Sequence, residues 1–110
     1  MNKNSQNNNP KFIPIGKIVN THGIKGEIRV LTDFLIIDQE LVFIPGTYLY
    51  FIVRNEYKKL HLTALRRHKK FLLLTFSGYE DLNAAESLKT QILYIKEPEG
   101  KHFVSSLLGF

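Results

Sequence analysis

Basic residues concentrated in one stretch of the sequence are the first feature with a clear chemistry. Residues 54–70 contain seven Lys or Arg and one Glu, a net charge of +6, whereas the rest of the chain has eight basic and nine acidic residues. Contacts with a phosphate backbone require such a run of cations, because each contact releases condensed counterions. In the alternative interpretation, Lys and Arg only solvate an exposed hairpin and block its edge-to-edge pairing with another chain. The pattern leaves both interpretations open.

A second group of candidate residues surrounds two glycines. Gly23 and Gly26 stand three apart between two expected strands, where glycine tolerates a positive φ. His22 directly before this turn has the chemistry of a base, a ligand or an RNA contact, or of a turn residue that hydrogen-bonds its own loop. Lys25 and Arg29 have the charge to contact phosphate, or are only solvated on a strand.

The remaining side chains do not form a catalytic or metal-binding set. The sequence has no cysteine, which excludes disulfides, thiol catalysis and a Cys-ligated zinc. It contains no P-loop, no dinucleotide fingerprint and no nucleophile elbow. The histidines lack the close spacing of a metal pair; they are His22, His61, His68 and His102. We therefore expect no enzyme activity, no metal or other cofactor, and no small-molecule substrate.

Short strands must position these residues. In the stretch 27–31, Ile28 and Val30 alternate with Glu27 and Arg29, which predicts a strand with the two apolar side chains inward. Glu27 follows the glycine turn and is expected to anchor it by accepting backbone N–H bonds. By alternation and by β-branched and aromatic content, strands are expected over residues 12–20, 27–31, 48–53, 60–65, 71–76 and 92–95. Turns are expected at 23–26, 45–46, 54–57 and 66–70.

One short helix is expected between the last two strands. Asn83 has the chemistry of an N-cap, and Glu86 has the spacing of a capping box. Lys89 is expected near the C-terminal end, where a cation suits the helix dipole. Six short strands and one helix predict an all-β fold, a six-stranded antiparallel β-barrel, since closure removes the exposed edges of short strands.

Two blocks of the sequence resemble a known family. The first is GKIVNTHGIKGEIRV, from Gly16 to Val30; the second is FSG at 76–78 followed by NAAESLK at 83–89. Their residues, order and separation are similar to those of the ribosome maturation factor RimM family, over residues 12–95. The resemblance implies an N-terminal six-stranded barrel similar to domain II of translation factors, followed by a second barrel of the PRC type.

The same resemblance implies a function. RimM-like proteins are cytoplasmic, non-enzymatic assembly factors that bind the immature small ribosomal subunit near its head and promote 16S rRNA processing. Their partners are 16S rRNA and a head ribosomal protein, the latter contacted mainly through the second barrel. The candidate RNA- or ribosome-binding residues are then His22, Gly23, Lys25, Gly26, Arg29, Arg66, Arg67, Lys69 and Lys70.

The domain organisation follows from composition and from the resemblance. Residues 1–10 are polar and Asn-rich and are expected to form a disordered tail, and residues 11–96 the RimM-like barrel. Residues 97–110 are expected to be a linker and the truncated start of a PRC-type barrel that is otherwise absent. No apolar run approaches the roughly 20 residues of a membrane span, so no membrane partner is expected.

Two alternative functions stay open at this stage. The apolar segment 34–44 motivates a protein–protein adaptor that binds a ribosomal protein without RNA contact, because exposed apolar surface marks interfaces. The aromatic residues near the basic stretch, Tyr48, Tyr50, Tyr57 and Phe71, motivate a generic barrel that stacks single-stranded nucleic acid. For these aromatic residues, packing in the barrel is the interpretation we prefer.

Overall fold

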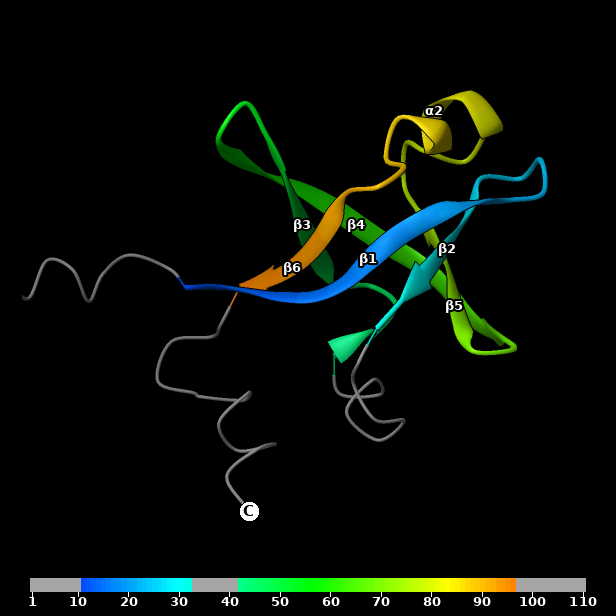
Figure 1. Cartoon of the computed structure of the whole chain (residues 1–110), viewed down its shortest axis with the longest axis horizontal. Helices are drawn as coiled ribbons and strands as arrows, with labels where there is room; N and C mark the ends of the chain where they lie inside the picture. Colours follow the sequence, from blue (N-terminus) through cyan, green and yellow to red (C-terminus); the bar gives the residue numbers. More distant parts are fainter. Residues whose placement is uncertain (1–10, 33–41, 97–110) are drawn as a thin grey trace, which may run out of the picture.

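Six antiparallel strands form a closed barrel in the computed structural model, which describes residues 11–32 and 42–96 (Figure 1). The elements are β1 (Phe12–His22), β2 (Glu27–Leu31), β3 (Tyr48–Val53), β4 (Glu56–His68), β5 (Phe71–Phe76), α2 (Leu82–Glu86) and β6 (Ile92–Lys96). Around the barrel the order is β1–β2–β5–β4–β3–β6, and β6 pairs back onto β1. The predicted fold class is confirmed. The predictions for residues 1–10 and 97–110 lie outside the described residues.

Inward-facing apolar side chains explain why these segments form a barrel. Ile28 and Val30 of β2 are fully buried, as their alternation with Glu27 and Arg29 predicts. Every strand contributes to the interior, with side chains at most 1% exposed that include Ile18, Ile28, Leu49, Leu60, Leu62, Leu74, Phe76 and Leu93. The barrel is therefore filled by its own side chains.

The described end of the apolar segment 34–44 belongs partly to this core. Val42 is 2% exposed and Phe43 is 1% exposed, whereas Ile44 is 44% exposed. The remainder of the segment, residues 34–41, lies outside the described residues. Val42 and Phe43 are consequently not available to the interface that the adaptor hypothesis places on this segment.

Strand β4 is longer than the sequence predicts. The predicted turn over 66–70 contracts to residues 69–70, since the ladder with β5 continues through the pairs Arg66↔Leu73 and His68↔Phe71. Likewise, the predicted turn over 54–57 contracts, because β4 already begins at Glu56. The basic stretch is therefore not one hairpin: it is a 13-residue strand with a turn at each end. Fully extended, such a strand is about 40 Å long, which separates the cations into two groups.

The helix begins earlier than the sequence predicts. Its N-cap is Asp81 rather than Asn83: the backbone N–H of Ala84 donates to Asp81 Oδ1 at 2.8 Å. It ends at Glu86, so Lys89 lies beyond the last turn, with its Nζ 3.7 Å from Glu86 Oε1. Asp and Asn have nearly equal capping chemistry, and the sequence offers both within three residues.

The β1–β2 turn is fixed against the segment that follows β5. Gly26 has φ +78°, and a Cβ built there would lie 2.5 Å from the carbonyl oxygen of Tyr79 and 2.5 Å from the carbonyl carbon of Glu80. Gly23 has φ +75° but open space around it. The first glycine of the pair is thus needed for backbone conformation only, and the second for conformation and close packing.

Candidate functional site

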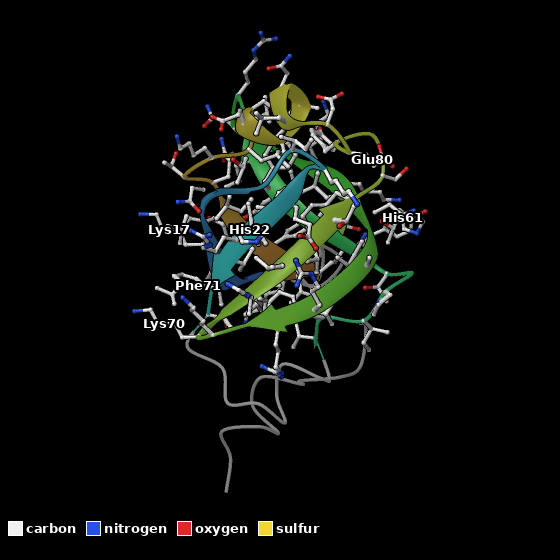
Figure 2. The ribbon with its side chains drawn as sticks, turned by 90° about the vertical axis from the view of Figure 1, so that its right-hand side faces the viewer. Lys17, His22, His61, Lys70, Phe71 and Glu80 are labelled. Carbon is white, nitrogen blue, oxygen red and sulfur yellow. The ribbon has the colours of Figure 1, made fainter. Side chains whose placement is uncertain are left out.

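One row of side chains crosses the outer surface of β2, β5 and β4. Arg29 of β2 pairs with Leu73 of β5, and Leu73 pairs on its other side with Arg66 of β4. Asn20 of β1 extends the row, opposite Arg29. We call this surface the basic face and define it by His22, Glu27, Arg29, Arg66, His68, Phe71 and Leu73. Figure 2 looks onto it, with His22 and Phe71 labelled.

Leu73 is buried although it lies outside the barrel core. It is 1% exposed, yet it is not a member of the cluster of side chains that fills the interior. Its cross-strand neighbours are Arg29 and Arg66, whose long aliphatic stems account for the burial. The apolar residue between two arginines therefore gives their stems a surface on which to lie.

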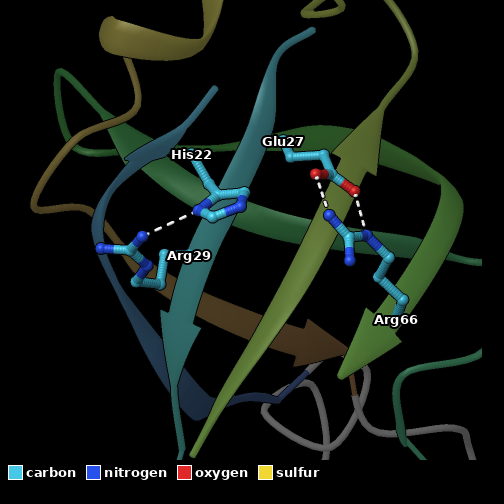
Figure 3. Close-up of polar contacts among 4 residues, drawn as sticks. All are labelled: His22, Glu27, Arg29 and Arg66. Carbon is cyan, nitrogen blue, oxygen red and sulfur yellow. Dashed lines mark hydrogen bonds and ion pairs between the residues drawn. The ribbon is translucent and has the colours of Figure 1, made fainter. Parts of the chain in front are cut away.

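Arg66 is held by an ion pair that spans three strands. Its Nε and Nη2 donate to Oε2 and Oε1 of Glu27, both at 2.8 Å (Figure 3). These hydrogen bonds lower the pKa of Glu27, against the opposing effect of burial. The sequence predicts that the Glu27 carboxylate accepts backbone N–H bonds and so anchors the turn. Among the described residues, its two oxygens accept from the Arg66 side chain instead. The charge of Arg66 is largely neutralised within the face.

Arg29 is held by His22. Arg29 Nη2 lies 2.8 Å from His22 Nδ1 (Figure 3). Because a guanidinium can only donate, Nδ1 is the acceptor and the neutral ring carries its proton on Nε2. The guanidinium carbon is 5.3 Å from the centroid of the Phe71 ring, within cation–π range. His22 therefore orients an arginine, a role beyond the alternatives that its place in the sequence suggested.

A second histidine, His68, lies beside the first. The ring centroids of His22 and His68 are 5.1 Å apart, although the residues are far apart in the sequence. Burial lowers the pKa of His68, as do the neighbouring positive charges of Lys69, Arg66 and Arg29, so the uncharged ring is favoured near neutral pH. Within residues 11–32 and 42–96, no group of three or more His, Cys, Asp or Glu could hold a metal ion.

The other predicted site residues divide into those near the basic face and those away from it. Lys70 is beside it, with Nζ 5.7 Å from the Phe71 centroid, and Lys69 shares the β4–β5 turn with a φ of 59°. Arg67 pairs with the inward residue Leu72, so it occupies the opposite side of β4 from Arg66.

The β1–β2 turn holds the remaining three candidates. Gly23 and Lys25 are exposed, whereas Gly26 is buried. Between them, Ile24 is 79% exposed, the most exposed large apolar side chain among the described residues. The contacts expected of these candidates with RNA, that of the buried Gly26 included, remain predictions.

Four members of the basic face were missed as site residues: Glu27, His68, Phe71 and Leu73. Glu27 was named only as a turn anchor, and Phe71 only as an aromatic near the cations. Their place in the face depends on β5 lying between β2 and β4. That arrangement joins strands far apart in the chain, and no local pattern encodes it. The one local signal was an aromatic residue directly after two lysines.

Of the aromatic residues named beside the basic stretch, Tyr48 and Tyr57 do not pack in the barrel, contrary to the preferred interpretation, whereas Tyr50 is buried at 8% exposure. Leu49 and Phe51 are the core residues of β3, so Tyr48 and Tyr50 face outward by alternation. Tyr57 of β4 is 42% exposed.

The fold and the site together define a class: a small closed β-barrel domain with a cationic outer face whose arginines are held in place. A family model described as the RimM N-terminal domain matches residues 13–99. The chain belongs to the RimM family.

Relatives in sequence carry the name of this family. The chain is 36% identical over 107 residues to a ribosome maturation factor RimM of Acetivibrio thermocellus. It is 43% identical over 109 residues to that of Bacillus subtilis. Each alignment covers 90% of this chain and 60% of the relative, so the chain spans less than two thirds of their length.

Two solved structures are similar. The crystal structure of a 16S ribosomal RNA processing protein RimM from Pseudomonas aeruginosa has a TM-score of 0.68 at 25% identity, covering 84% of this chain and 53% of that one. The solution structure of the N-terminal domain of RimM from Thermus thermophilus has a TM-score of 0.61 at 18% identity, covering 84% and 96%. The second likeness shows the fold alone.

Proposed function

We propose that this barrel is the part of a ribosome maturation factor that binds 16S rRNA on the immature small ribosomal subunit. It acts in the cytoplasm by binding and not by catalysis, and it promotes 16S rRNA processing. For the part of the longer relatives that this chain does not cover, the proposed partner is a ribosomal protein of the subunit head. Among the described residues, no helix is both long and apolar enough to cross a membrane.

The observation that carries this proposal is the way Arg29 is held. Its Nη2 is bonded to His22, its guanidinium lies against Phe71, and its Nε is buried without a hydrogen-bond partner among the described residues. A guanidinium fixed in this way loses little side-chain entropy when it binds an anion. Lys25 and Lys70, both exposed near the same face, add cations for neighbouring phosphates.

The test is co-sedimentation of the chain with immature small ribosomal subunits. The double variant Lys25→Glu, Lys70→Glu removes two cations beside the basic face and leaves Arg29 and His22 intact. Binding should fall at least about tenfold, and the slope of log affinity against log salt should become shallower by about 1.4–1.8, the value expected for two phosphate contacts.

The matched control is Lys89→Glu. Lys89 is a half-exposed lysine beyond α2, and its change should leave subunit binding at the wild-type level. If the double variant sediments like the wild type, the basic face is not the binding surface. If the wild-type chain does not sediment with the subunits, the proposal fails as a whole.

The exposure of Ile24 favours a second candidate function, the protein adaptor. An isoleucine 79% exposed at a turn tip is suited to an apolar pocket of a partner protein. The chain has no cysteine, so Ile24→Cys supplies a single site for a cross-linker. Cross-links from that site to a ribosomal protein, without links to rRNA, support the adaptor over RNA binding at this turn.

A further inference from the structure

A second outer surface, formed by β1, β6, β3 and the start of β4, gathers aromatic side chains. We call it the aromatic face and define it by Phe12, Tyr48, Tyr50, Tyr57 and Tyr94 together with Lys59 and Lys96. Tyr50 of β3 pairs with Tyr94 of β6 on one side and with Lys59 of β4 on the other. In the barrel order β3 and β6 are separated from β2 and β5 by β1 and β4, so the aromatic and basic faces are distinct surfaces (Figure 1).

The rings of this face support one another. Phe12 stacks on Tyr57, with centroids 3.6 Å apart and planes 9° from parallel. Phe12 also meets Tyr50 edge to face at 5.1 Å, and Tyr94 meets Tyr57 edge to face at 5.2 Å. Residues from four strands therefore fix the rings in place, which makes the surface a rigid platform.

The platform is open to solvent, and its charge is positive. Tyr48 is 48% exposed and Tyr57 is 42% exposed. Lys59 Nζ lies 4.9 Å from the Tyr48 centroid, and Lys96 Nζ lies 5.9 Å from the Tyr50 centroid. By strand alternation the outward positions of β3, of β6 and of β4 up to His61 carry no carboxylate; they are Tyr48, Tyr50, Ile52, Ile92, Tyr94, Lys96, Tyr57, Lys59 and His61.

We propose that the aromatic face binds single-stranded RNA. Unpaired bases stack on the exposed rings of Tyr48 and Tyr57, and Lys59 and Lys96 pair with the phosphates between them. Aromatic rings among cations suit single strands, because every base offers a π-face and the backbone offers charge, whereas bases inside a duplex are already stacked. This inference rests on the proposed function, which supplies RNA as the class of ligand. It adds a second contact surface and specifies that the RNA bound there is single-stranded.

Charge and the packing of the rings favour RNA over a protein partner on this face. The rings of Phe12 and Tyr50 cover part of each other, and Tyr50 is only 8% exposed. The most exposed side chains of the face are the hydroxylated rings of Tyr48 and Tyr57 and the lysines Lys59 and Lys96. This surface is less suited to an apolar anchor of a protein than to a polyanion with planar groups.

The test is fluorescence anisotropy of the full chain with a labelled, unstructured RNA oligomer of about ten nucleotides, within the site sizes of stacking barrels. Tyr48→Ala should weaken binding about 5- to 150-fold, the range that loss of one stacked base gives. Tyr48→Phe keeps the ring and should bind like the wild type. Tyr48 is chosen because its ring contacts, His61 and Lys59, lie at the surface, whereas Tyr57 supports Phe12.

Three outcomes overturn the inference. They are wild-type affinity for the oligomer in Tyr48→Ala, equal wild-type affinity for the oligomer and for its duplex, and ultraviolet cross-links on immature subunits that join the Tyr48 peptide to protein instead of RNA. The Lys25→Glu, Lys70→Glu variant separates this inference from the proposed function. It should lose subunit binding while its affinity for the oligomer still falls when Tyr48→Ala is added.

Discussion

Replacing Gly26 by alanine should destabilise the barrel far more than the same change at Gly23. The two glycines share nearly the same backbone conformation, with φ +78° and φ +75°. Their surroundings differ, because a Cβ at Gly26 meets the backbone of Tyr79 and Glu80 at 2.5 Å, whereas a Cβ at Gly23 meets nothing within 4 Å. Gly23→Ala is therefore a matched control that isolates the clash.

The magnitude has two contributions. Holding alanine in the left-handed region costs about 1–2 kcal/mol, and this cost applies to both variants. At Gly26, backbone atoms at 2.5 Å must also retreat by nearly 1 Å to reach ordinary contact, and overpacking of this kind costs about 1–3 kcal/mol more. We expect a loss of about 1–2 kcal/mol for Gly23→Ala and about 2–5 kcal/mol for Gly26→Ala.

Urea denaturation of both variants beside the wild type measures these losses. In thermal melts of a domain of this size, each kcal/mol of lost stability should lower the Tm by about 4–8 °C, so the two variants can also be distinguished by Tm. Equal losses for the two variants would refute the close approach of the β1–β2 turn to residues 79–80.

Two further predictions concern the helix cap and an ion pair. Asp81→Ala should cost about 0.5–2 kcal/mol in denaturant unfolding, because it removes the acceptor for the N–H of Ala84, whereas Asn83→Ala should cost much less; the opposite order would move the cap to Asn83. Because Arg66 lowers the folded-state pKa of Glu27, the carboxylate stabilises the fold above its ordinary pKa of 4.5, and this contribution disappears as the pH falls through the lowered value. The stability advantage of the wild type over Glu27→Gln, small as for other exposed ion pairs, should thus shrink on acidification in thermal melts at pH 7 to 3; an advantage that grows would contradict the pairing.

Local patterns were sufficient for the barrel and for the strand that carries Arg29. Alternation in residues 27–31 predicts the buried Ile28 and Val30 because a strand has a period of two, which needs no knowledge of its partners. The glycine turn and its positive φ values follow from residue type in the same way. The resemblance to RimM rests on these same residues, and the family match confirms it.

Local patterns failed where pairing partners decide the structure. Residues 66–68 are polar and were predicted to turn, but the ladder with β5 supplies their backbone hydrogen bonds and keeps them extended. Asp81 and Asn83 both have capping chemistry, and only the path of the chain between β5 and the helix selects Asp81.

The sequence by itself determined the fold class, the family and the location of most of the charge, because these depend on residue types and on short-range periods. Only the tertiary structure decided which charges act together. Closure of the barrel puts β5 between β2 and β4, which joins Glu27 to Arg66 and brings His22 beside His68. It also divides one basic stretch between two faces, since β4 runs from the tyrosines of the aromatic face to the arginines of the basic face. The physical reason is that strand pairing is a long-range interaction, and its register is fixed by the whole core and not by the residues that display the charge.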